Sequence, residues 1–108
     1  MMKVITNNNI QCTVALAALQ NVMDPEIGLN IVDLGLVYEI EIKDEGKVQI
    51  KMTLTAPGCP VAGDIVFDVQ TKVEAIVGVT DVHVQLTFDP PWDKEMMTEE
   101  AKLELGFL

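Results

Sequence analysis

The sequence has little positive charge. Lysine and arginine together number 7 of its 108 residues, against 17 aspartates and glutamates, so the formal net charge is −10. A protein that binds nucleic acid through its phosphates needs a basic patch, and so does one that binds an anionic membrane surface. The composition therefore predicts no nucleic-acid partner and no membrane partner, and it leaves a basic protein or a bound cation open.

Cysteines, aromatic residues and long apolar runs are also scarce. Cys12 and Cys59 are the only cysteines, and they form neither a CxxC pair nor a disulfide framework. No apolar run approaches the roughly 18 residues of a membrane span. Residues 1–9 are too polar for a signal peptide, and we expect them to form a frayed lead. The sequence predicts a cytoplasmic protein with a single domain, residues 1–108, and an aliphatic core.

Hydrophobic periodicity predicts two long helices and three strands. Residues 10–23 and 61–77 have apolar residues every three or four positions, whereas residues 36–43, 47–54 and 80–88 alternate. We expect an α+β fold, a two-layer sandwich in which a three-stranded sheet packs on two helices in the order α-β-β-α-β. The pattern leaves open which strand the third one pairs with. Because such a sheet has exposed edges and an uncovered face, we also expect a homodimer.

The alternation makes finer predictions about side-chain direction. In a hairpin of the first two strands, Glu39 would lie near Lys51 on the outer face, where the two charges attract. Tyr38 would face the core with its apolar neighbours. The third strand would also bury its last apolar residues, Leu86 and Phe88.

The C-terminal part begins with residues 89–93, which cannot continue a strand because their prolines donate no ladder hydrogen bond. The tail that carries Trp92 would either pack over the sheet edge or a loop, or serve as a flap that binds a client protein. Thr98 is a candidate N-cap for a short C-terminal helix.

The strand-to-helix turn at residues 53–60 is the candidate for chemistry. Pro60 suits the first position of a helix, so Cys59 would lie beside the N-cap at the positive end of the helix dipole. That position lowers the pKa of a thiol and favours the thiolate, which attacks carbon centres or binds metal. The alternative is an inert, buried cysteine. We interpret Cys12 as a small apolar residue on a helix face, and His83 as an exposed histidine on the polar face of a strand.

The loop from Asp24 to Gly35 carries three carboxylates. Asp24 and Glu26 are close enough in sequence to converge on one site. The alternative for each is a turn carboxylate that is solvated or binds the local backbone. Long loops in small domains are either functional or packed by their own apolar side chains, and this loop has residues for both.

Three separate motifs resemble those of the SufT/PaaD-like metal–sulfur cluster biosynthesis family. They are DPEIG at residues 24–28 followed by DLGLVY at 33–38, MTLTAPGCP at 52–60, and LTFDPPW at 86–92. The resemblance covers nearly the whole chain in the same order. PaaD-like members often carry further cysteines toward their C-terminus, which this chain lacks, so it is more similar to the short SufT-like type.

The resemblance implies a non-enzymatic iron–sulfur cluster assembly or maturation factor, which hands a transient cluster to client proteins alongside the assembly machinery. The family's reactive cysteine matches Cys59, its acidic pair matches Asp24 and Glu26, and the threonine of the turn matches Thr55. Cys59 is then the expected metal ligand, and all four are expected cluster-binding residues. A lone cysteine cannot hold a cluster, so two chains, a client or a small thiol would complete the ligation.

Two other functions remain open from the residues. In the first, the chain is an adaptor that docks clients on the cluster assembly machinery, and Cys59 is structural. In the second, which we rank last, it is a thiol enzyme with Cys59 as nucleophile and Asp24, Glu26 or His83 as base.

Overall fold

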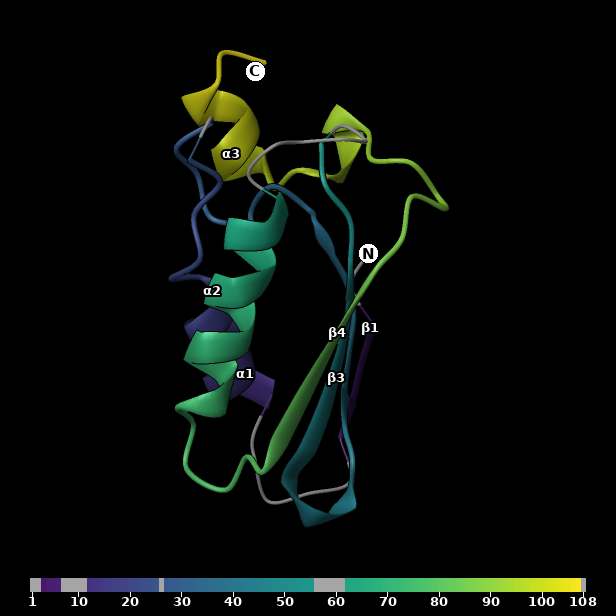
Figure 1. The fold of residues 1–108 in the computed structure, drawn as a ribbon. Coiled ribbons are helices and arrows are strands. Elements are labelled where there is room, and N and C mark those ends of the chain that lie inside the picture. The colour runs from purple at the N-terminus through teal and green to yellow at the C-terminus, as the bar shows by residue number, and fades with distance from the viewer. Residues whose placement is uncertain (1–2, 7–11, 26, 56–61, 108) are drawn as a thin grey trace.

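The computed structural model describes residues 3–6, 12–25, 27–55 and 62–107. Four strands form one layer, and α1 and α2 cover one of its faces (Figure 1). The predicted α+β sandwich is confirmed. The elements in chain order are β1 (Lys3–Thr6), α1 (Cys12–Leu19), β2 (Val37–Ile42), η1 (Asp44–Gly46), β3 (Lys47–Met52), α2 (Ala62–Glu74), β4 (Asp81–Leu86), η2 (Lys94–Met96) and α3 (Glu99–Glu104).

In the part of the chain that the structure describes, the sheet has four strands in the order β1-β2-β3-β4, one more than predicted. β1 pairs in parallel with β2, so the expectation of a frayed lead is wrong for Lys3–Thr6. A strand of this length carries too short a pattern to be recognised, and pairing with the open edge of β2 supplies its hydrogen bonds. β4 pairs in parallel with β3, which answers the question of strand order that the sequence left open.

The β2–β3 hairpin has the predicted register, with Glu39 opposite Lys51. A bulge between Val37 and Glu39 changes the side-chain directions beyond it. Val37 pairs with Met52 and is buried, whereas Tyr38 is the extra residue. The prediction that Tyr38 faces the core is wrong because one inserted residue reverses the alternation of the strand.

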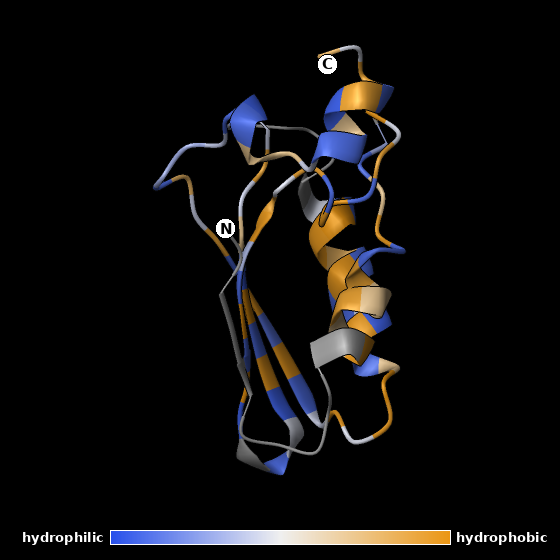
Figure 2. Cartoon of the chain, turned by 180° about the vertical axis from the view of Figure 1, so that it is seen from behind, coloured by the Kyte–Doolittle hydropathy of each residue, from blue (hydrophilic) through white to orange (hydrophobic). Residues whose placement is uncertain are grey.

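The core lies between the sheet and the two longer helices, and hydrophobic and hydrophilic residues alternate along the strands (Figure 2). Ile65, Val69 and Val73 form the predicted buried face of α2. Leu86 and Phe88, expected in the core, are 39% and 41% exposed. Leu86 ends β4, which has a neighbouring strand on one side only among the described residues, and Phe88 lies beyond the end of the strand. In the described ranges, every helix is too short or too polar to cross a membrane.

The C-terminal strap, which we define as residues 87–98, is tied back to the long loop. The Trp92 indole Nε1 donates a hydrogen bond of 2.7 Å to the Leu34 carbonyl, and the Thr98 amide donates one of 2.9 Å to the Asp33 carbonyl. Trp92 packs against the core, which is the first of its two predicted roles. Thr98 also caps α3 as predicted, because its hydroxyl accepts from the Ala101 amide at 3.2 Å.

The strap approaches the loop so closely at one point that only glycine fits. Gly35 has φ +78°, and a Cβ there would collide with the backbone of Met96. We expect Gly35→Ala to lower the free energy of unfolding by at least about 2 kcal/mol, because it adds this collision to the cost of a left-handed alanine. Gly28→Ala is the matched control, since Gly28 has φ +83° but open space around it, and it should cost about 1 kcal/mol. Urea denaturation measures both, and equal losses would contradict the collision.

Candidate functional site

Asp24 lies buried at the start of the long loop, with 2% of its surface exposed. Its carboxylate Oδ1 accepts a hydrogen bond of 3.3 Å from the Ile27 amide. Its backbone closes the same turn, because its amide donates to the Leu29 carbonyl at 2.9 Å and its carbonyl accepts from the Gly28 amide at 2.7 Å. Asp24 therefore binds the backbone of its own loop, and its predicted part in a site with Glu26 stays a prediction.

The end of this loop meets the exit from β3. The Thr53 amide donates a hydrogen bond of 2.8 Å to the Leu36 carbonyl, which extends the hairpin ladder by one residue. Thr53 and Leu54 are both buried, and Thr55 is half-buried. Asp24 and Thr55 thus belong to two segments that the fold joins at the same end of the sheet.

Cys59 and Glu26 lie outside the described residues, so their predicted places in the site stay predictions. Cys12 begins α1, and its side chain also lies outside the description. α2 starts at Ala62, within one residue of the predicted start and three residues after Cys59. The first turn of α2 carries the exposed carboxylate of Asp64.

In the described ranges, a metal site would require several His, Cys, Asp or Glu side chains close together. No group of three or more His, Cys, Asp or Glu side chains there could hold a metal ion. His83 is exposed on the polar face of β4, as predicted, and pairs with Gln49 of β3.

A pocket of about 510 Å³ lies between the long loop, the outer face of the hairpin and the C-terminal strap. The Tyr38 hydroxyl donates to the Pro90 carbonyl at 2.8 Å and contacts the Met96 sulfur at 3.6 Å. Burial raises the pKa of Tyr38, and the nearby Thr53 hydroxyl partly offsets the rise. The bulge that turns Tyr38 outward gave no signal in the sequence. The lining residues are Val32, Gly35, Val37, Tyr38, Glu39, Lys51, Asp89, Pro90, Met96 and Thr98.

The family model and the relatives that match this chain all have names that refer to iron–sulfur clusters or to Fe-S proteins. The model of a family described as iron–sulfur cluster assembly protein matches residues 13–86. An Fe-S protein maturation auxiliary factor of Porphyromonas gingivalis is 54% identical over 90 residues, which cover 83% of this chain and 86% of that protein. The Fe-S protein maturation auxiliary factor SufT of Staphylococcus aureus is 45% identical over 85 residues, covering 79% and 97%. An iron-sulfur cluster carrier protein of Deinococcus radiodurans is 37% identical over 70 residues, covering 65% of this chain but 20% of that protein.

Two solved structures share the fold over most of both chains. A domain of unknown function, DUF59, from Bacillus anthracis is 41% identical with a TM-score of 0.83, and the match covers 90% of this chain and 92% of that one. A conserved hypothetical protein of Thermotoga maritima is 46% identical with a TM-score of 0.79, covering 90% and 95%.

The buried carboxylate of Asp24 makes a prediction about stability. We expect Asp24→Ala to lower the free energy of unfolding by about 1 to 3 kcal/mol, because the Ile27 amide loses its carboxylate acceptor and keeps only the Asp24 carbonyl at 3.3 Å. Asp24→Asn keeps an acceptor oxygen and should lose less. The exposed Glu74 provides a control, since Glu74→Ala should stay within about 0.5 kcal/mol of the wild type. Equal stability of Asp24→Ala and the wild type in urea would show that the loop does not depend on this carboxylate.

The position of Tyr38 makes a prediction about alkaline pH. Its folded pKa is raised above 10.0, so the unfolded chain releases the phenolic proton first. The stability that Tyr38 contributes is therefore complete below pH 10 and is lost as the pH rises through the folded pKa. Tyr38 is the only tyrosine, so phenolate absorbance follows it directly, and the folded midpoint should exceed that of the denatured chain. Coinciding midpoints would contradict its burial, and Tyr38→Phe should flatten the fall in stability.

Proposed function

The chain belongs to the iron–sulfur cluster assembly protein family, and from that membership we propose that it carries a transient iron–sulfur cluster and hands it to client proteins. It acts in iron–sulfur cluster assembly and maturation. This is the function that its relatives, the maturation auxiliary factors and the cluster carrier, have in their names. It acts as a carrier and catalyses no reaction of its own. Because a thiolate ligand must stay reduced, the cytoplasm is the compartment that suits this work.

Cys59 is the proposed thiolate ligand. Its support is the family motif around it and its position, three residues before the start of α2, where a helix dipole favours a thiolate. Thr55 and Glu26 are proposed to contact the cluster from the turn and from the loop. For Asp24 we propose a supporting role, because its carboxylate binds the backbone of the loop that carries Glu26.

A single cysteine at the site requires shared ligation. Iron–sulfur clusters are usually held by four protein ligands, and this chain offers one thiolate in the matching motif. A second copy of the chain in a homodimer, a client protein or a small thiol would supply the rest. Incomplete ligation suits a carrier, because a cluster that is held by few bonds leaves more readily.

An adaptor remains the second candidate, and the charge of −10 favours it as well as the carrier, because an acidic surface attracts basic clients. The two functions differ in what Cys59 does. In an adaptor this cysteine is structural and binds no iron. Replacing Cys59 would therefore abolish cluster binding only if the chain is a carrier.

Replacing Cys59 separates the two functions. After anaerobic reconstitution with ferrous iron and sulfide, we expect wild type to show the visible absorption of an iron–sulfur cluster and to transfer the cluster to an apo-ferredoxin. Cys59→Ser should lose most of both, because serine offers no thiolate. Cys12→Ser is the matched control, since it removes the other cysteine of the chain, and it should behave as the wild type does.

The opposite results are equally informative. A Cys59→Ser protein that binds and transfers clusters normally would exclude the carrier mechanism. A Cys59→Ser protein that binds no cluster but still matures clients in cells would favour the adaptor.

A further inference from the structure

Among the described residues, β4 has a neighbouring strand on one side only, which leaves its other backbone edge unpaired. The Thr87 amide, just after β4, donates to the Met52 carbonyl of β3 at 2.9 Å. The Thr53 amide, just after β3, points away from β4 and donates to the Leu36 carbonyl at 2.8 Å. Because alternate residues of a strand face opposite neighbours, the N–H and C=O groups of Val82, Val84 and Leu86 point away from β3. Within the described ranges, no hydrogen bond to another element uses these groups.

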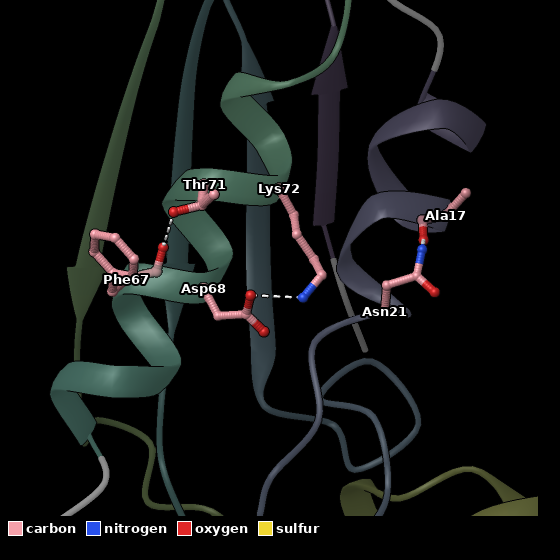
Figure 3. A network of polar contacts seen from close by, with 6 residues as sticks. All are labelled: Ala17, Asn21, Phe67, Asp68, Thr71 and Lys72. Carbon is pink, nitrogen blue, oxygen red and sulfur yellow. Dashed lines mark hydrogen bonds and ion pairs between the residues drawn. The ribbon is translucent and has the colours of Figure 1, made fainter.

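Large apolar side chains are exposed beside this edge. Leu86 and Phe88 lie at its C-terminal end, and Phe67 of α2 is 69% exposed. α2 packs on β4 and on α1. Figure 3 shows Lys72 pointing toward α1 and Phe67 on the side of α2 turned away from α1. Phe67 therefore belongs to the side of the molecule that carries the β4 edge.

Carboxylates surround these apolar residues. Asp64 and Glu74 share the exposed face of α2 with Phe67, at helical spacings of three and seven residues from it. Asp81 and Asp89 are exposed just before and after the apolar part of β4. An extended segment with lysine or arginine between apolar residues complements this arrangement. A second copy of the chain does not, because each copy carries a charge of −10.

We propose that the β4 edge docks an extended segment of the client protein, in which apolar and basic residues alternate, as a fifth strand of the sheet. Backbone hydrogen bonds to Val82, Val84 and Leu86 supply binding, and the apolar side chains and carboxylates around them select the sequence. This inference rests on the proposed function, since the client is the chain that receives the cluster.

Amide hydrogen exchange tests the edge directly. The probe is a capped peptide of alternating lysine and valine. In the free protein, the amides of Val82, Val84 and Leu86 should exchange at least about tenfold faster than those of Gln85 and Thr87. Saturating peptide should slow the first set at least about tenfold and leave the second nearly unchanged. A glutamate–valine peptide should not bind, and a lysine–valine peptide with alternate N-methylated amides should bind far more weakly.

A pair of matched variants tests the apolar end of the edge. Leu86→Lys should weaken peptide binding about tenfold, because it removes apolar contact and adds like charge. Val77→Lys makes the same charge change at a residue that is 95% exposed in the turn before β4, and it should bind nearly as the wild type does. Both variants should keep the reconstituted cluster absorption.

Several results would overturn the proposal. They are unchanged exchange at Val82, Val84 and Leu86 with saturating peptide, equal affinities of wild type and Leu86→Lys, and a peptide-free dimer in sedimentation whose edge amides are already protected. The last result would assign the edge to a second copy of the chain. Peptide binding without cluster reconstitution would count against the proposed function alone and leave the docking edge standing.

Discussion

The pairing of β2 with β3 is the constraint on which the rest of the structure depends. β1 adds to the outer edge of β2, and β4 adds to the outer edge of β3, so both parallel pairs use this hairpin as their template. Its turn is joined to the start of β4, because the Thr80 amide donates to the Gly46 carbonyl at 2.9 Å. Its open end receives the long loop through the bond from Thr53 to Leu36. A shift of this register by one residue would therefore move every other element.

Local patterns predicted the parts of the fold that local forces decide. The alternation of β2 and β3 set the pairing of Glu39 with Lys51, and the apolar period of α2 identified its buried face. β1 and the Tyr38 bulge could not be predicted in this way. β1 has four residues and pairs with the open edge of β2, and the bulge places Tyr38 where its hydroxyl donates to the Pro90 carbonyl of the strap. Both depend on residues far away in the sequence.

The candidate site likewise has one part that the sequence predicted and one part that it did not. Its location at the exit of β3 and the start of α2 followed from the motif, and the described residues place Thr55 and α2 accordingly. The burial of Asp24 did not follow, because an aspartate after a helix is usually solvated, and here the loop folds over it. Cys59 and Glu26 lie outside the described residues, so the convergence of the acidic pair on the thiol stays a prediction.

The free edge of β4 and the proposed cluster site lie at segments that the sheet brings together. The bond from Thr87 to Met52 places the end of β4 beside the exit of β3, and Thr55 follows that exit directly. Neighbouring strands lie about 4.8 Å apart, so a client strand on β4 would run about 10 Å from β3. A client docked there would bring its own cysteines to the end of the sheet from which the Cys59 segment leaves. Docking would then supply the ligands that a single thiolate lacks, and it would give the cluster a direct route from carrier to client.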